Sequence, residues 1–168
     1  MRARAALACV LLLAAGQATA QLRDADPDWR ESEVPAPPDF DASRVILLDM
    51  PRHMSVKLGV DPGSLRITSD GIVRYVMVAQ SPSGTVNATY EGIRCQTAEV
   101  KVYARYTSSK VWNMVSNPEW KSLRDNQPSP HALAFARQGA CDGRSTVMNT
   151  TQAIVDKLKT VERASLHR

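Results

Sequence analysis

Histidine and cysteine are scarce in this 168-residue sequence, which contains three of each. The histidines are His53, His131 and His167, and none has a second ligand at the short spacing typical of zinc sites. The sequence also lacks G-x-S-x-G, a Walker glycine loop and G-x-G-x-x-G. These absences argue against zinc enzymes, nucleophile-elbow hydrolases and nucleotide-binding enzymes, and we expect neither a bound metal nor a cofactor.

Long hydrophobic runs are absent beyond the N-terminus. Two arginines precede an apolar stretch at residues 5–15, and Ala18-Thr19-Ala20 supplies an A-x-A cleavage site. The apolar stretch is too short for a bilayer core of about 30 Å. We therefore expect residues 1–20 to be a signal peptide cleaved after Ala20, and the mature chain to be periplasmic without a transmembrane segment.

No charge of one sign dominates the chain. The 21 Lys and Arg residues face 17 Asp and Glu residues, and two of the arginines are lost with the signal peptide. No basic cluster stands out in the rest of the sequence, so we expect no nucleic-acid surface. The chain that remains is long enough for one ordinary domain with its own core.

Only Cys95 and Cys141 remain once the signal peptide, with Cys9, is removed. The residues before Cys9 fit a lipoprotein signal poorly. An even cysteine count in an exported chain favours a disulfide, which would close a loop of about 47 residues and stabilise the fold by about 4 kcal/mol in the chain-entropy estimate. The alternative is a free nucleophilic cysteine, which needs a neighbouring histidine and protection from oxidation.

Residues 21–43, called the arm below, contain the acidic, proline-rich segment DADPDWRESEVPAPPDFD, which has no periodicity. This composition predicts an extended segment. It is either a docking segment or a poorly ordered leader lying over the domain, with Trp29 and Phe40 available to pin it. The remaining residues, 44–168, are expected to form a single α+β domain.

From residue 44 to residue 115, short apolar or alternating runs are separated by Gly, Pro, Asp and Ser, which predicts antiparallel strands. The predicted strands are residues 44–50, 64–68, 72–80, 85–95, 99–106 and 110–115. Gly71 ends a three-residue loop that a positive φ would close into a hairpin. The turns are too short for crossover helices, so we expect an antiparallel meander of about five to seven strands.

Two helices are predicted after the strands, at residues 129–139 and at about 147–164. Ser129 can cap the first, with Pro130 at its first position. The second carries Ile154, Val155 and Leu158 on one stripe, which favours packing against the sheet over docking to a partner or a membrane. The predicted fold is therefore an α+β domain whose C-terminal helices pack on the sheet, with one disulfide.

In the strand predicted at residues 85–95 the apolar residues change face. Val86 and Tyr90 occupy even positions, whereas Ile93 and Cys95 occupy odd positions, so in a regular strand the two pairs point to opposite faces. We expect a β-bulge at Gly92 to return Ile93 and Cys95 to the core side. The next strand alternates regularly, which predicts one apolar and one solvated face. Because bulges often lie near functional sites, the polar residues beside it are candidates for a binding group, but a structural bulge with solvated charges is the favoured interpretation. The candidate binding residues are Tyr90, Glu91, Arg94 and Arg105.

Four segments, in order and spacing, resemble the cryptic neisserial protein family, a group of exported proteins of Gram-negative bacteria. The segments are DMPRHMSVKLGVDPGSLRITSDGIVRYVMVA, NATYEGIRCQTAEVKVYARY, NPEW and HALAFARQGACDGR, between about Asp49 and Arg144. The resemblance implies an envelope protein in which Cys95 pairs with Cys141. It transfers no catalytic residue, cofactor or substrate.

An exported, disulfide-linked chain without catalytic spacing favours a soluble periplasmic binding or interaction module over an enzyme, with an envelope protein or envelope ligand as its partner. The alternative is an envelope-directed hydrolase using Asp and Glu, for example Asp49 with Asp70 or Glu91. A subunit of a larger envelope assembly is a third class, which would show an exposed apolar patch or an unpaired sheet edge.

Overall fold

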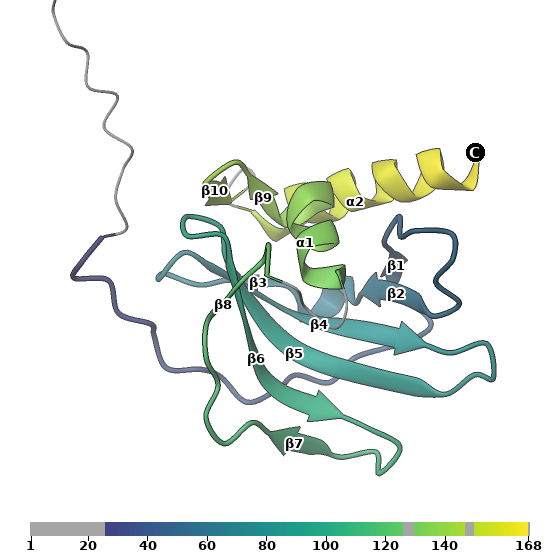
Figure 1. Ribbon diagram of the computed structural model, residues 1–168, viewed down its shortest axis with the longest axis horizontal. Helices are drawn as coiled ribbons and strands as arrows, with labels where there is room; N and C mark the ends of the chain where they lie inside the picture. The colour runs from purple at the N-terminus through teal and green to yellow at the C-terminus, as the bar shows by residue number, and fades with distance from the viewer. Residues whose placement is uncertain (1–25, 126–129, 147–149, 168) are drawn as a thin grey trace, which may run out of the picture.

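The computed structural model describes residues 26–125, 130–146 and 150–167 (Figure 1). The predicted signal peptide with its cleavage site, Ser129 and residues 147–149 lie outside these ranges. Eight strands form one sheet and two short strands form a separate ribbon. The strands are β1 (Ile46–Leu47), β2 (Lys57–Val60), β3 (Arg66–Ile67), β4 (Ile72–Gln80), β5 (Val86–Arg94), β6 (Glu99–Tyr106), β7 (Trp112–Met114), β8 (Lys121–Ser122), β9 (Cys141–Asp142) and β10 (Ser145–Thr146).

The main sheet is the antiparallel meander that the sequence predicts. Its order is β1-β2-β4-β5-β6-β7, with β3 beside β4 and β8 beside β6. The central ladder pairs all nine residues of β4 with β5. Gly71 closes the β3–β4 hairpin with a φ of +78°, as expected. The unpredicted β2 lies between β1 and β4; its four residues, KLGV, include a glycine and give too short a signal to be read as a strand.

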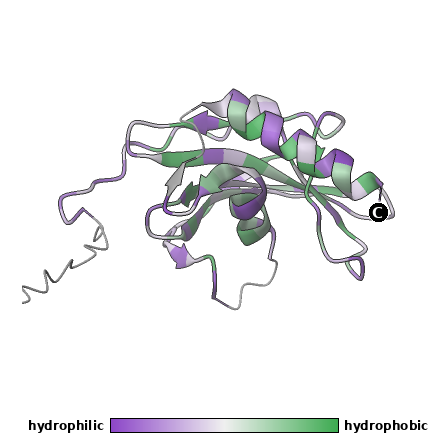
Figure 2. Cartoon of the chain, turned by 90° about the horizontal axis from the view of Figure 1, so that it is seen from above, coloured by the Kyte–Doolittle hydropathy of each residue, from purple (hydrophilic) through white to green (hydrophobic). Residues whose placement is uncertain are grey.

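Helices cover one face of the sheet, which we call the helix face (Figure 1). Helix α1 (His131–Phe135) continues into a π-helical turn, η2 (Ala136–Ala140), and α2 (Thr151–Leu166) follows. The Phe135 ring lies 4.4 Å from the Tyr75 ring of β4. Helix α2 buries Ile154, Val155 and Leu158 as predicted, and Figure 2 shows its alternating apolar and polar bands above the sheet.

Residues 26–43 of the arm cover the opposite face, which we call the arm face, so the sheet has a second core. In Figure 1 the purple arm crosses the sheet on the side away from the helices. Phe40 packs edge-on against Tyr106 and Trp112, with ring centroids 5.0 and 5.8 Å away. The buried residues of this core are Val76, Val78, Ala88, Tyr90, Tyr103 and Ala104. A three-layer arrangement results: helices, sheet and arm.

The predicted bulge at Gly92 is wrong, because the β4–β5 ladder runs unbroken through that residue. The strand β5 therefore keeps strict alternation along its whole length. Val86 and Tyr90 belong to the arm-face core, whereas Ile93 and Cys95 belong to the helix-face core. The phase change in the sequence thus reflects two buried faces rather than an extra residue.

An irregularity does occur nearby, in β6. Tyr90 faces Ala104 and Glu91 faces Val102, which leaves Tyr103 as the extra residue. The predicted single apolar face of β6 is therefore wrong: Val102 lies on the helix face with Glu91, and Ala104 lies on the arm face with Tyr90. Gly92 makes room for the displaced tyrosine, since a Cβ at this position would lie 2.6 Å from the Tyr103 hydroxyl.

The predicted disulfide is present. Cys95, just after β5, is bonded to Cys141 at the start of β9, with an S–S distance of 1.94 Å. It ties the centre of the sheet to the end of η2. Within the described residues, no helix is both long and apolar enough to cross a membrane.

Candidate functional site

The four candidate binding residues do not form one group. Because β5 alternates without a bulge, Tyr90 and Arg94 lie on the arm face and Glu91 lies on the helix face. Arg105 is paired with Thr89 and shares the helix face with Glu91. The structure therefore divides the candidates between two layers, and each layer has its own polar cluster.

On the helix face, Glu91 is the centre of a buried hydrogen-bond network. Its side chain is 1% exposed and accepts hydrogen bonds from the hydroxyls of Tyr75 and Thr89, both at 2.6 Å. The His131 Nε2 atom lies 2.9 and 3.1 Å from the two carboxylate oxygens. His131 is the first residue of α1, so the contact fastens that helix to the centre of the sheet.

The Glu91–His131 contact shifts the pKa of both partners toward their charged forms. Burial alone would raise the pKa of Glu91, but the charge and hydrogen bond of His131, with the two hydroxyl donors, lower it below its ordinary value. Burial would lower the pKa of His131, but the Glu91 carboxylate raises it above its ordinary value, against a smaller opposing effect of Arg105. Each partner therefore favours the charged form of the other.

The contacts of this pair suit an anchor of the fold. All donors around Glu91 already point at its oxygens, and the other ring nitrogen of His131, Nδ1, is buried without a hydrogen-bond partner. A general base needs a nitrogen that reaches the substrate. A hollow of about 290 Å³ lies alongside, lined by His131 and mostly apolar side chains such as Met54, Leu58 and Met77.

On the arm face, Glu31 of the arm inserts its carboxylate among four donors. Lys101 Nζ and the Tyr103 hydroxyl lie 2.7 Å from its oxygens, Trp120 Nε1 lies 3.3 Å away, and the guanidinium of Arg74 lies 3.6 Å away. Burial and the negative charge of Glu31 together raise the pKa of Tyr103, so this hydroxyl stays protonated and remains a donor. The arm is thus fixed by charge as well as by apolar contacts.

A second polar contact joins the arm to the β3–β4 hairpin. Asp70 pairs with the fully buried Arg74 at 3.1 Å and accepts hydrogen bonds from the backbone and hydroxyl of Ser32 at 2.9 and 2.6 Å. Burial would raise the pKa of Asp70, but these hydrogen bonds lower it well below its ordinary value. Arg94 stacks on the Trp29 ring at 3.6 Å, so Arg94 faces the arm rather than open water.

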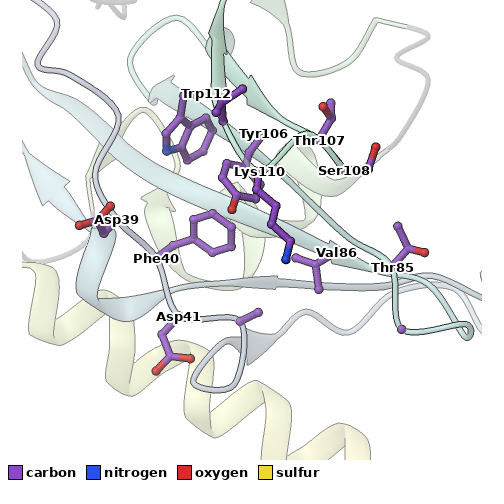
Figure 3. A pocket seen from close by; sticks show the side chains of 13 residues that line it. Asp39, Phe40, Asp41, Thr85, Val86, Tyr106, Thr107, Ser108, Lys110 and Trp112 are labelled. Atoms are coloured by element: carbon purple, nitrogen blue, oxygen red, sulfur yellow. The ribbon is translucent and has the colours of Figure 1, made fainter.

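A hollow of about 810 Å³ lies at the far end of the arm face (Figure 3). We call it the aromatic hollow. Phe40 of the arm, Tyr106 of β6 and Trp112 of β7 meet there, with ring centroids 5.0 to 5.8 Å apart. Polar side chains complete the lining: Asp39, Asp41, Thr85, Thr107, Ser108 and Lys110.

Lys110 occupies an unusual position in this hollow. It lies in the loop between β6 and β7, and its φ is +57°, in the left-handed region that favours glycine. A lysine there costs about 1 kcal/mol relative to glycine. In Figure 3 its side chain reaches over the hollow toward Val86. The strained backbone therefore places an ammonium group beside the aromatic rings.

The two carboxylates of the hollow differ in what they can offer a ligand. Asp41 accepts a hydrogen bond from the Ser43 hydroxyl at 2.6 Å and pairs with Arg44 at 2.8 Å. The hydrogen bonds from Ser43 lower the pKa of Asp41. Asp41 is therefore ionised and already partnered, which leaves Asp39 and Lys110 as the charged groups available to a ligand.

Among the residues of the two clusters, the sequence singled out Glu91, Arg94, Asp70 and Trp29, but it did not indicate the contacts that Glu31 and His131 make. Glu31 and His131 meet their partners across 40 or more residues, and no local spacing marks such a contact. For the aromatic hollow, the sequence contains one indication: two aromatic residues, Tyr106 and Trp112, lie on either side of a short polar loop. They pair directly across the β6–β7 hairpin. In the part of the chain that the structure describes, no three His, Cys, Asp or Glu side chains are grouped to hold a metal.

Comparison with known proteins identifies a family. The model of the CNP1-like family matches residues 24–159, which is most of the chain, so the protein belongs to that family. Neither the curated proteins nor the solved structures gave a match.

Proposed function

We propose that this member of the CNP1-like family is an exported periplasmic protein, related to the cryptic neisserial protein, that binds a saccharide of the cell envelope in the aromatic hollow. The hollow itself is the observation that carries the proposal. Its volume of about 810 Å³ is in the range of small-molecule sites, and three segments distant in sequence build it.

The chemistry of the lining favours a neutral, polyhydroxylated ring. A sugar presents C–H groups on its faces and hydroxyls at its edge, so it can rest on aromatic rings while its hydroxyls exchange hydrogen bonds with polar side chains. Phe40, Tyr106 and Trp112 supply the rings. Asp39 and Lys110 supply an acceptor and a donor of opposite charge, and their balance favours a neutral ligand over an ion.

A binding role fits the described carboxylates better than hydrolysis does. An acid–base hydrolase needs one carboxyl group that keeps its proton. The pKa of Glu91, Asp70 and Asp41 is lowered in each case, so all three are ionised at neutral pH. They are also held by neighbouring donors, which suits structural anchors.

Isothermal titration calorimetry with a β-1,4-linked N-acetylglucosamine trisaccharide tests the proposal. We expect saturable binding by the wild-type protein. Lys110→Gly removes the ammonium donor without straining the loop and should weaken binding about fivefold, the effect of losing one hydrogen bond of about 1 kcal/mol. Met114→Ala, at an exposed position of β7 that does not line the hollow, is the matched control and should bind as the wild type does.

Two results would count against the proposal. One is the absence of heat of binding for the trisaccharide and for a neutral hexose disaccharide at millimolar concentration. The other is equal affinity of the wild type and Trp112→Ala, provided that the circular dichroism spectrum of the variant shows it to be folded.

A further inference from the structure

A separate hollow of about 320 Å³ lies beside the disulfide, on the helix side of the sheet. Cys95, Cys141, Leu123, Leu133 and Ala136 form its apolar part. Three cationic side chains line the rest: Arg124, Arg137 and Lys157. We call it the cationic hollow. It shares no residue with the aromatic hollow.

The three cations come from separate parts of the chain. Arg124 follows β8, Arg137 belongs to η2, and Lys157 belongs to α2. The fold brings them together because the disulfide draws the end of η2 against the sheet. Arg124 and Arg137 are exposed and Lys157 is half-buried, so their charged ends remain within reach of a ligand from solvent.

The three cations form no ion pair with the described part of the protein. The ion pairs found there involve Arg44, Arg74, Lys101 and His131, and none involves the three cations of this hollow. Asp142 also lines the hollow, so the charged side chains of the lining are three cations and one carboxylate, and their sum is positive. Three like charges around one concave surface repel one another, and a bound anion would relieve that repulsion.

We propose that the cationic hollow binds a phosphate group. Two planar guanidinium groups can each donate paired hydrogen bonds to phosphate oxygens, and a lysine ammonium adds a point charge. The volume, at the low end of small-molecule sites, suits one phosphorylated head group rather than a polymer. The apolar floor beside the disulfide accepts the carbon atoms next to the phosphate.

The phosphate can come from a soluble phosphorylated molecule or from the head group of a phospholipid. Both present the same oxygens to the same three cations. The inference is independent of saccharide binding, because it rests on a different hollow with a different lining.

The test compares two lysines of α2 that are two residues apart. Lys157 lines the hollow, whereas Lys159 is exposed and does not line it. Lys157→Gln and Lys159→Gln make the same change of charge in the same helix. Binding of inorganic phosphate is followed at low ionic strength by calorimetry. We expect Lys157→Gln to weaken phosphate binding about fivefold and Lys159→Gln to weaken it less than about twofold.

A flotation assay separates the two sources. Vesicles of phosphatidylcholine containing phosphatidylglycerol are compared with vesicles of phosphatidylcholine alone. Co-flotation with the anionic vesicles that Lys157→Gln reduces and Lys159→Gln does not supports the proposal with a lipid source. Phosphate binding without co-flotation supports it with a soluble source. No phosphate binding by the wild type, or equal losses in the two variants, overturns it.

Discussion

Replacing Glu91 with glutamine removes the charge of the most buried acidic side chain in the helix-face network while keeping its shape. Glu91 is 1% exposed and accepts from Tyr75, Thr89 and His131. In Glu91→Gln the ring of His131 keeps its place but loses the carboxylate that stabilises its charged form. The hydroxyls of Tyr75 and Thr89 can rotate to suit an amide. The stabilisation that is lost is therefore mainly that of the charged His131 ring.

Removing one partner of a buried ion pair costs about 3–5 kcal/mol, because the other is left without compensation. For a domain of this size each kcal/mol lowers the melting temperature by about 2–4 °C, so we expect a decrease of about 6–20 °C. Urea denaturation followed by circular dichroism measures the free energy of unfolding directly. Glu119→Gln, at an exposed position, is the control and should change it by less than about 0.5 kcal/mol.

The pH dependence of stability gives an independent check. The folded state lowers the pKa of Glu91, so its contribution is present above the ordinary pKa of 4.5 and is lost as the pH falls through the folded pKa. The folded state raises the pKa of His131, so that contribution is complete below 6.5 and is lost as the pH rises through the folded pKa. The pair therefore stabilises the wild type most between these two values.

In Glu91→Gln the decrease in stability above pH 6.5 should disappear, because the raised pKa of His131 depends on the carboxylate. A loss below 1 kcal/mol, or an unchanged pH profile, would refute the assignment of Glu91 and His131 as a stabilising ion pair.

Three further predictions concern other parts of the fold. Gly92→Ala should cost about 1–3 kcal/mol in urea denaturation, because its Cβ would lie 2.6 Å from the Tyr103 hydroxyl; at Gly63 the nearest atom is 3.5 Å away, so Gly63→Ala should be close to neutral. Replacing both Cys95 and Cys141 with serine should lower the free energy of unfolding by about 4 kcal/mol, and dithiothreitol should destabilise the wild type but not this variant. Lys110→Gly should raise the melting temperature through a gain of about 1 kcal/mol, since glycine tolerates the φ of +57°; a lower melting temperature would contradict the strain.

The parts of the fold that local patterns encode could be predicted from the sequence. The run IVRYVMVAQ is β4 residue for residue, and Gly71 marks the hairpin before it. The even pair of cysteines identifies the disulfide, and the apolar stripe of α2 identifies the side that packs on the sheet. The strand, hairpin and helix signals each lie within a short stretch of sequence, whereas the disulfide follows from the even number of cysteines.

The arm-face core could not be predicted in the same way. The bulge expected at Gly92 assumed that only one face of the sheet is buried, but Val86 and Tyr90 pack beneath the arm while Ile93 and Cys95 pack beneath the helices. An extended arm has no periodicity, so the sequence does not reveal that it forms a layer. The contacts of Glu31 with Lys101 and Tyr103 join residues 70 and 72 positions apart, and only the folded sheet brings them together.

The candidate site could be predicted from the sequence only in part. Glu91 was selected because it lies in a strand that changes phase, and it is indeed the centre of a network. The sequence analysis considers His131 as a metal ligand and as part of a predicted helix, but not as the partner of Glu91, because opposite charges forty positions apart leave no pattern in one sequence. The cationic hollow was missed for the same reason, since its three cations lie on separate elements.

The position of the arm has a consequence for the order in which the chain folds. Synthesis proceeds from the N-terminus, so Trp29, Glu31 and Phe40 emerge before any strand of the sheet. Their partners include Arg94, Lys101, Tyr106, Trp112 and Trp120, which emerge some 65 to 90 residues later. The first part of the domain to be made is therefore among the last to find its place. The contacts of Ser32 with Asp70 can form once the β3–β4 hairpin exists, whereas those of Phe40 with Tyr106 and Trp112 require β6 and β7, so the arm completes its docking only when the whole sheet is present.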